Sequence, residues 1–300
     1  MNPSQSEETN MPFEDVMANV QRMLMATEAL AAIGAELSLK QPGQEPGDPR
    51  VQGALTSVSA AAGIDLETLT PPQQAMVLGI IRLNFAQADD ILREPGRAPG
   101  WTYTDPLVLE GMGRGSMMIP QLLASQPEFR SVDSLLDVGA GVGLLAVSAA
   151  NVWPSATVVG IDVWEPALER ARANVQNAGL DDRITLRNQD ATALDDTDVY
   201  DCAWLPTFFL DEDAMTPAIS SVKRALRPEG WIALGLFAAP PDPVAQATTK
   251  LRTIRSGGSD LDPKRASNLL HDAGYQSVRT IEPSGPAPII FVIGQKAQVA

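Results

Sequence analysis

The chain has 300 residues, enough for one large domain or two smaller ones, and with 44% hydrophobic and 20% charged residues its composition is typical of a soluble globular protein. Its net charge of −15, with no basic stripe along the sequence, argues against binding to nucleic acids or anionic membranes. Cys202 is the only cysteine, and because the chain shows neither a signal-peptide pattern nor a run of ~18 apolar residues, we expect a cytoplasmic, soluble protein without a disulfide.

The first third of the chain shows apolar residues at helical spacing and no strand-like alternation. Residues 1–12 are mostly polar and are expected to form a disordered tail. Asp48-Pro49 and Thr70-Pro71 each supply a helix cap followed by a proline at the first helical position. The predicted helices are Phe13–Leu39, Pro49–Ala62, Pro71–Leu92 and Pro106–Leu123. Residues 13–130 are therefore predicted to be a helical cap that takes part in substrate binding.

A connector rich in proline and glycine, Glu94–Asp105, interrupts this helical region. It carries Trp101 and Tyr103, two of the few aromatic residues of the chain. One hypothesis is that Trp101–Asp105 closes over a bound cofactor as a lid. The alternative is that the two rings fill the seam between subdomains, since large aromatic side chains serve both purposes.

From Ser131 onward strands and helices alternate. The predicted strands are Leu135–Val138, Thr157–Val163, Ile184–Asn188, Val199–Leu205, Trp231–Phe237, Val278–Glu282 and Ile289–Gly294. The predicted helices between them are a segment beginning near Val142, Pro166–Ala178, Ala218–Leu226, Val244–Ile254 and Asp262–Ala273. Repeated β-α units of this kind predict an α/β fold, with a doubly wound, mostly parallel sheet covered by helices on both faces. Residues 131–300 are predicted to be this domain.

The first of these strands ends in a turn with three glycines at alternate positions, Gly139, Gly141 and Gly143. Ligands of doubly wound sheets lie beyond the carboxyl ends of the strands, so this turn is the predicted cofactor site. A dinucleotide site has the pattern G-x-G-x-x-G, whereas here Leu144 stands where the third glycine would be. Asp137 is unfavourable beside a pyrophosphate but well suited to a ligand with an ammonium or sulfonium charge.

Two further carboxylates end the next strands of the predicted sheet. Asp162, 23 residues beyond Gly139, is placed to accept hydrogen bonds from two ribose hydroxyls, although it could also cap the helix that follows. Asp190 could accept from an adenine amino group or be a plain turn residue. Together with Asp137, these acids surround one site and favour a cationic nucleoside cofactor.

With these residues in place, the chain resembles the Rossmann-like (class I) S-adenosylmethionine-dependent methyltransferases. The matching motifs are D-V-G-A-G-V-G (137–143), G-I-D-V (160–163), N-A-G-L-D-D-R-I-T-L (177–186), Q-D-A (189–191) and L-R-P-E-G-W (226–231). The resemblance implies a seven-stranded sheet of order 3-2-1-4-5-7-6 and S-adenosylmethionine as cofactor, with S-adenosylhomocysteine as product. It also implies cofactor contacts for Asp137, Gly139, Ala140, Gly141, Gly143, Asp162, Val163, Asp190 and Ala191.

The acceptor side is predicted from the aromatic residues near the same edge of the sheet. The expected substrate pocket consists of Trp101, Tyr103, Trp204, Pro206, Phe208, Phe209 and Phe237, with Trp204 and Tyr103 also near the cofactor. Tyr103, Asp211 and Glu212 are the candidate general bases, although both acids could instead be solvated surface residues. Arg114 could pair with the carboxylate of the cofactor or lie on the surface, and the single histidine, His271, is expected on the surface. No metal site is predicted.

These residues predict a biosynthetic methyltransferase that acts on a small, partly apolar or aromatic metabolite, at an oxygen, nitrogen or carbon atom. The resemblance further suggests a homodimer formed through the N-terminal helices. Two other functions stay open: a catalytically silent S-adenosylmethionine-binding partner protein, and a nicotinamide-dependent oxidoreductase.

Overall fold

The computed structural model describes residues 11–45, 47–238, 240–282 and 289–298, and the chain divides into two compact units, residues 1–85 and 86–300. The first ten residues of the predicted disordered tail lie outside the described residues, and Pro12 directly precedes the first helix. The second unit begins well before the predicted boundary at residue 131. It therefore includes the connector and the helices that follow it.

The first unit is a small helical assembly. Its elements are α1 (Phe13–Leu39), α2 (Pro49–Ala61), the short 3-10 helix η1 (Leu66–Thr68) and the larger part of α3 (Pro71–Arg93). As the sequence predicts, Asp48 caps α2, where its side chain accepts a hydrogen bond from the backbone N–H of Arg50 at 2.8 Å. The core of this unit is formed by Ile33, Leu37, Leu66, Leu78 and Ile81.

Helix α1 is buried only near its C-terminal end, at Ile33, Gly34, Glu36 and Leu37. Large apolar side chains on roughly its first three turns are exposed, most of them at helical spacing. They are Phe13, Val16, Met17, Val20, Met23 and Leu24. Phe13 keeps 72% of its surface accessible, which is unusual for an aromatic side chain outside an interface.

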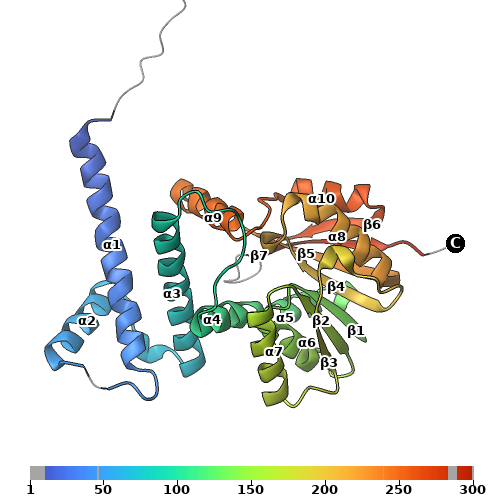
Figure 1. Cartoon of the computed structure of the whole chain (residues 1–300), viewed down its shortest axis with the longest axis horizontal. Coiled ribbons are helices and arrows are strands. Elements are labelled where there is room, and N and C mark those ends of the chain that lie inside the picture. The colour runs from blue at the N-terminus through green and yellow to red at the C-terminus, as the bar shows by residue number, and fades with distance from the viewer. Residues whose placement is uncertain (1–10, 46, 239, 283–288, 299–300) are drawn as a thin grey trace, which may run out of the picture. The chain divides into compact units, whose positions relative to one another are not determined.

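A seven-stranded sheet of order β3-β2-β1-β4-β5-β7-β6 forms the centre of the second unit, which confirms the predicted fold (Figure 1). The strands are β1 (Ser134–Val138), β2 (Thr157–Asp162), β3 (Ile184–Asn188), β4 (Tyr200–Pro206), β5 (Leu226–Phe237), β6 (Tyr275–Ile281) and β7 (Ile289–Lys296). β1 to β5 pair in parallel, whereas β7 is antiparallel to both β5 and β6. The carboxyl ends of β1 to β5 therefore meet at one edge of the sheet.

Helices cover both faces of this sheet (Figure 1). One face packs against α5 (Ile119–Ala124), α6 (Leu144–Val152) and α7 (Glu165–Asn177), and the other against α8 (Glu212–Ala225) and α10 (Pro263–Asp272). Two further helices lie near the carboxyl edge: α4 (Pro106–Ser116) contacts α6, and α9 (Pro243–Arg255) contacts the 3-10 turn η4 (Thr207–Phe209) after β4. A hydrophobic core lies on each face of the sheet, and successive strand residues point to opposite cores. Leu135, for example, belongs to the core beneath α5 and α6, and Leu136 to the core beneath α8 and α10.

Two predicted helices have different bounds in the structure. The helix predicted over 106–123 is divided into α4 and α5, because Pro120 has no N–H to donate and its ring would crowd the carbonyl of Ser116. The helix predicted over 218–226 begins at Glu212 instead, where the side chain of Asp211 caps it by accepting from the N–H of Ala214 at 2.7 Å. Asp211 and Glu212, predicted as candidate bases, are therefore the cap and the first residue of a helix.

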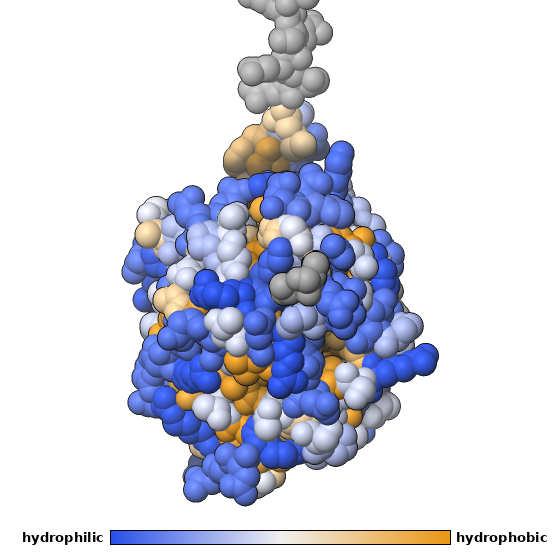
Figure 2. Space-filling model, turned by 90° about the vertical axis from the view of Figure 1, so that its right-hand side faces the viewer, coloured by the Kyte–Doolittle hydropathy of each residue, from blue (hydrophilic) through white to orange (hydrophobic). Residues whose placement is uncertain are grey.

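Hydrophilic residues predominate on the face of the molecule shown in Figure 2, with hydrophobic residues visible between them. Across the described ranges, no helix is long and apolar enough to cross a membrane. Within the same ranges, no group of three or more His, Cys, Asp or Glu side chains is arranged to hold a metal ion.

Candidate cofactor and acceptor site

The glycine turn after β1 depends on backbone conformations that favour glycine. Gly139, Gly141 and Gly143 have φ angles of +71°, +53° and +74°, in the left-handed region that side chains with a Cβ disfavour. The N–H groups of Gly139 and Ala140 both donate to the carbonyl oxygen of Ile161, at 2.8 and 3.0 Å. Gly143 directly precedes α6, so the turn ends at a helix N-terminus as the sequence predicts.

Asp162, at the end of β2, holds this turn in place. One of its carboxylate oxygens accepts from the N–H of Gly141 at 2.8 Å, and the other accepts from the N–H of Trp164, also at 2.8 Å. The contact with Trp164 forms a local turn before α7 and is not the helix cap considered as an alternative, because α7 has no side-chain cap. The contact with Gly141 joins the turns after β1 and β2. Each oxygen retains a lone pair, so these contacts are compatible with acceptance from ribose hydroxyls.

Asp137, the last residue but one of β1, is 1% exposed, and neither of its carboxylate oxygens has a hydrogen-bond partner in the described part of the chain. It pairs in register with Gly160 on β2 and with Trp204 on β4. Burial, reinforced by the negative charge of Asp162, raises the pKa of Asp137 to about 8. Burial also raises the pKa of Asp162, whereas the hydrogen bonds that its carboxylate accepts from backbone N–H groups act to lower this pKa. Two adjacent acids at the turn therefore favour a cationic ligand.

Helices α4 and α7 support the turn from outside. Gly113 on α4 lies so close to Val142 that a Cβ at this glycine would stand 2.2 Å from the Val142 Cγ2 atom. Asn174 on α7 donates to the carbonyl oxygen of Val142 at 2.9 Å, and the carboxylate of Glu110 on α4 accepts from Arg170 and Asn174. The turn is thus held between two helices by both packing and hydrogen bonds.

The other predicted cofactor residues differ in how exposed they are to solvent. Asp190 follows β3 and is exposed; its Oδ1 accepts from the N–H and hydroxyl of Thr192, so it also forms the turn considered as its alternative role. Val163 is 64% exposed, whereas Ala191 is buried. Arg114 is partly exposed on α4.

Trp204 occupies a core position. It is 2% exposed, its ring lies over Gly235 and it packs edge-to-face against Phe291 at a centroid distance of 5.8 Å. These contacts favour a role in packing the sheet. Pro206, two residues further along β4, lies beside the turn, where its Cγ atom would be 3.4 Å from a Cβ at Gly139.

The aromatic residues predicted for the acceptor side come together. The ring of Trp101 lies edge-to-face with those of Tyr103 and Phe209, at centroid distances of 5.1 and 5.4 Å. Phe208 contacts Phe209 at 4.9 Å and stacks on Phe237 at 4.3 Å. We call these five residues the aromatic wall. Phe209 and Phe237 are each more than a third exposed, so the wall offers apolar surface to a ligand.

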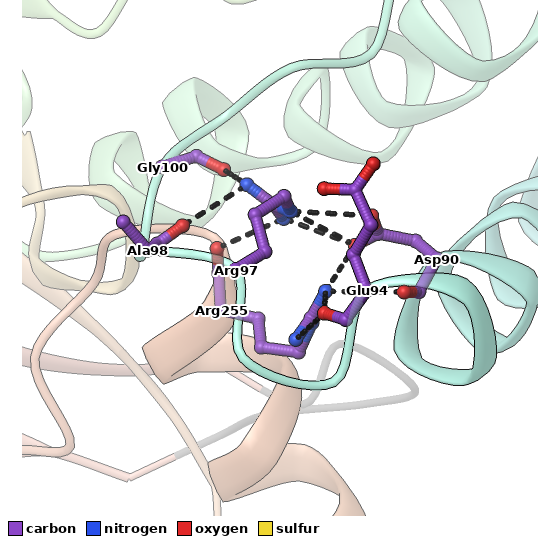
Figure 3. A network of polar contacts seen from close by, with 6 residues as sticks. All are labelled: Asp90, Glu94, Arg97, Ala98, Gly100 and Arg255. Atoms are coloured by element: carbon purple, nitrogen blue, oxygen red, sulfur yellow. Dashed lines mark hydrogen bonds and ion pairs between the residues drawn. The ribbon is translucent and has the colours of Figure 1, made fainter.

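A cluster of ion pairs, which we call the connector clamp, fixes the segment that carries Trp101 (Figure 3). The carboxylate of Asp90 accepts from Arg97 at 3.0 Å and from Arg255 at 2.7 Å, and all three side chains are less than 20% exposed. The pair of arginines lowers the pKa of Asp90, with the bond to Arg255 as the main cause. The N–H of Gly100 donates to the carbonyl oxygen of Arg255 at 2.9 Å. The clamp therefore joins the end of α3, the connector and the end of α9.

A second attachment joins the connector to the cofactor edge. The indole N–H of Trp164, in the turn after β2, donates to the carbonyl oxygen of Tyr103 at 3.1 Å. Trp101 and Trp164 also pack against the small apolar cluster of Leu109, Val142 and Ala167. The predicted lid segment is thus in contact with the residues that surround the glycine turn.

The candidate bases of the sequence are engaged in other roles. Asp211 caps α8, and Glu212 forms an ion pair with Arg265 on α10. Burial raises the pKa of the Tyr103 phenol, which keeps it protonated at neutral pH and makes it a poor base. His271 is exposed on α10, as predicted.

Sequence reasoning missed Trp164 and the connector clamp. Trp164 could have been noticed, because it stands two residues after Asp162 and carries one of the few indole groups. The clamp gave no such signal, since Asp90 and Arg255 are 165 residues apart in the chain.

Comparison with known proteins identifies the domain that contains this site. Residues 135–230 match the sequence family described as "Methyltransferase domain". The matched segment includes the glycine turn, Asp162 and Asp190. This segment is therefore similar to a methyltransferase domain, and the strand order of the whole sheet is that of the class I methyltransferase fold.

The individual relatives agree with this assignment. The chain is 34% identical over 122 residues to the 27-O-demethylrifamycin SV methyltransferase of Amycolatopsis mediterranei, a match that spans 40% of this chain and 44% of that enzyme. It spans less than half the length of the first curated relatives that it matches.

Two solved structures extend the similarity of fold to almost the whole chain. An O-methyltransferase family protein from Burkholderia thailandensis has a TM-score of 0.72 at 15% identity, with 96% of this chain and 99% of that one covered. Human N-acetylserotonin methyltransferase, solved in complex with S-adenosylmethionine, has a TM-score of 0.70 at 12% identity, with 98% and 100% covered.

The residues of the methyltransferase domain fit S-adenosylmethionine as the cofactor. The two orphaned oxygens of Asp137 suit the ammonium group of its methionyl end, and Asp162 can accept from its ribose. The bare backbone of Gly139–Gly143 permits close approach. When bound, the cofactor supplies an electrophilic methyl group, and the chain has to bind, orient and desolvate the two reactants.

The close approach of α4 to the glycine turn can be tested with a matched pair of variants on that helix. We expect Gly113→Ala to lower the free energy of unfolding by about 1–3 kcal/mol, because the new Cβ overlaps a buried valine. A Cβ at Gly115 meets nothing within 4 Å, so Gly115→Ala should be neutral or stabilise by up to about 1 kcal/mol through helix propensity. Urea unfolding checks both variants, and equal effects would contradict the described packing.

Proposed function

We propose that this protein is an S-adenosylmethionine-dependent methyltransferase that acts on a small, partly apolar or aromatic metabolite in a biosynthetic pathway. The observation that carries the proposal is the hydrogen bond from Gly141 to Asp162, which forms one cofactor cradle from two strand ends of a methyltransferase domain. The small-molecule class is supported by the aromatic wall and by the relative that methylates a demethylrifamycin. The lone cysteine is buried and free, which agrees with a cytoplasmic location.

The three candidate bases are unsuited to proton removal, and this limits which chemical groups the enzyme could methylate. Methyl transfer from a sulfonium is a direct displacement, so a nucleophile that is already ionised or has a free lone pair needs no base. Because Asp211, Glu212 and Tyr103 are unsuited to remove a proton, we propose an acceptor that is nucleophilic at neutral pH, such as an acidic phenol, a carboxylate or a weakly basic amine. The aromatic wall would hold its apolar body by stacking and edge contacts.

We further propose that the protein is a homodimer through its N-terminal helices. The exposed apolar side chains of α1 support this, because a second copy of the same helix offers a complementary apolar surface.

The cofactor assignment predicts micromolar or tighter binding of S-adenosylmethionine in isothermal titration calorimetry and no binding of NAD. Asp162→Ala should weaken this binding more than tenfold, because it removes a charged acceptor of ribose hydroxyls together with the anchor of the glycine turn. Asp181→Ala, an exposed acid between α7 and β3, is the matched control and should bind as the wild type does. Binding of NAD in place of S-adenosylmethionine would refute the proposal.

Turnover separates an enzyme from a silent binding protein. We expect S-adenosylhomocysteine to accumulate when the protein is incubated with S-adenosylmethionine and fractionated small metabolites. Tight binding without turnover on any fraction would favour the silent binding protein.

The connector is expected to close over the cofactor, since Trp164 joins it to the turn after β2. Trp101→Ala and Tyr103→Ala should each raise the Kd for S-adenosylmethionine severalfold and lower turnover, because they remove ring contacts that hold the connector. Thr102→Ala changes an exposed residue between them and serves as the control. If both aromatic variants retain wild-type affinity and turnover, Trp101–Asp105 is not a lid.

The proposed dimer predicts a mass of two chains in size-exclusion chromatography with light scattering. Val16→Glu combined with Val20→Glu should convert it to a monomer, because both charges would be placed on the apolar face of α1. Gln21→Glu, at an exposed polar position of the same helix, should leave the dimer intact. A wild-type protein with the mass of one chain would exclude this assembly.

A further inference from the structure

The carboxyl group of Asp137 is the most unusual buried group of the second unit. It is 1% exposed, and both of its oxygens lie without a hydrogen-bond partner among the described residues. A carboxylate in such a place has lost its hydration without compensation, which is costly unless the group takes up a proton. In the free protein the group is therefore held neutral, and its pKa of about 8 agrees with this state.

The surroundings of Asp137 explain why no protein group relieves it. Its strand neighbours in register, Gly160 and Trp204, offer no charge, and the charged group that acts on its pKa is another acid, Asp162. On the same face of the sheet, Cys202 is fully buried, and burial raises the pKa of its thiol, so it stays neutral.

The helices that pack on this face add no cation bound to Asp137. Neither α5 nor α6 carries an ionisable side chain. On α7, Arg170 pairs with Glu110 and Arg172 pairs with Glu165. Helix α4 carries Glu110, which is engaged by Arg170 and Asn174, and Arg114, which is partly exposed. A bound cation would therefore be the first positive charge to reach the orphaned carboxyl group.

We propose that S-adenosylmethionine binding is coupled to ionisation of Asp137: the neutral carboxyl group of the free protein releases its proton to solvent and becomes the carboxylate partner of the ammonium group of the cofactor. This inference rests on the proposed function. The O–H bond of the carboxyl group breaks, its electron pair stays on the carboxylate oxygen, and the proton is taken up by buffer. Affinity for the cofactor is thereby linked to pH.

The sign of the linkage follows from the two states. Below pH 8 the free protein carries a proton on Asp137 that the complex lacks, so binding strengthens as pH rises from 6 to 7.5, by up to tenfold per unit. In the absence of cofactor the same group destabilises the fold as pH rises above the ordinary range of an Asp, because the unfolded chain ionises more readily. Asp137→Asn should remove both effects.

The test is isothermal titration calorimetry of the full chain with S-adenosylmethionine at pH 7, in two buffers with different ionisation enthalpies. We expect close to one proton released per cofactor bound, and the same release with S-adenosylhomocysteine, which keeps the ammonium group but lacks the sulfonium. Asp137→Asn should bind without proton release and with a Kd that is flat from pH 6 to 7.5. The exposed-site control Asp181→Asn should behave as the wild type.

Each alternative outcome is decisive. Wild-type binding without proton release, or release that persists in Asp137→Asn, overturns the inference while leaving the cofactor assignment intact. Release with S-adenosylmethionine alone overturns the assignment to the ammonium group. Failure of either ligand to bind removes the proposed function and this inference together.

A second readout needs no ligand. Thermal unfolding should show Asp137→Asn gaining in Tm relative to the wild type as pH rises from 5 to 8, whereas a constant difference would contradict the neutral, buried carboxyl group.

Discussion

The carboxylate of Asp162 is the interaction on which the site depends. It accepts N–H groups from Gly141 and Trp164, and so fixes the turns after two neighbouring strands relative to each other. The glycine turn can take this course only because three of its residues have positive φ angles. Packing of α4 and α7 against Val142 then leaves the turn little freedom. The cradle is therefore formed before any ligand arrives, which lowers the ordering cost of binding.

Beside this cradle, segments that are remote in the sequence form the proposed acceptor side. The connector clamp holds the residues before Trp101 through a partly buried carboxylate shared by two arginines (Figure 3). The indole of Trp164 holds the residues after Trp101. Between these two attachments the ring of Trp101 meets that of Phe209, which follows β4. Because both arginines bind the same carboxylate, the clamp orients the connector even where its net contribution to stability is small. The aromatic wall is thus held in place from both ends of the connector.

Most of the sheet, and the acids at its carboxyl edge, could be predicted from the sequence because their signals are local. Strand-ending acids such as Asp162 and the glycine spacing of the turn are readable within a few residues. The packing of Trp204 could not be predicted, because a central parallel strand is apolar on both faces. Only the position of the Trp204 ring over Gly235 shows which way this side chain lies. The start of α8 was not predicted because Pro217 interrupts the helical pattern. The connector clamp was not predicted because it joins segments that are distant in the sequence.

The central claim is that the glycine turn, Asp137 and Asp162 bind S-adenosylmethionine with its reactive end toward the aromatic wall. A crystal structure of the complex with S-adenosylhomocysteine tests it most directly. The account predicts ribose hydroxyls within hydrogen-bond distance of Asp162, the ammonium group at Asp137, and the sulfur facing Phe208 and Phe209. A nucleoside bound elsewhere, or a sulfur that faces away from these rings, would contradict it.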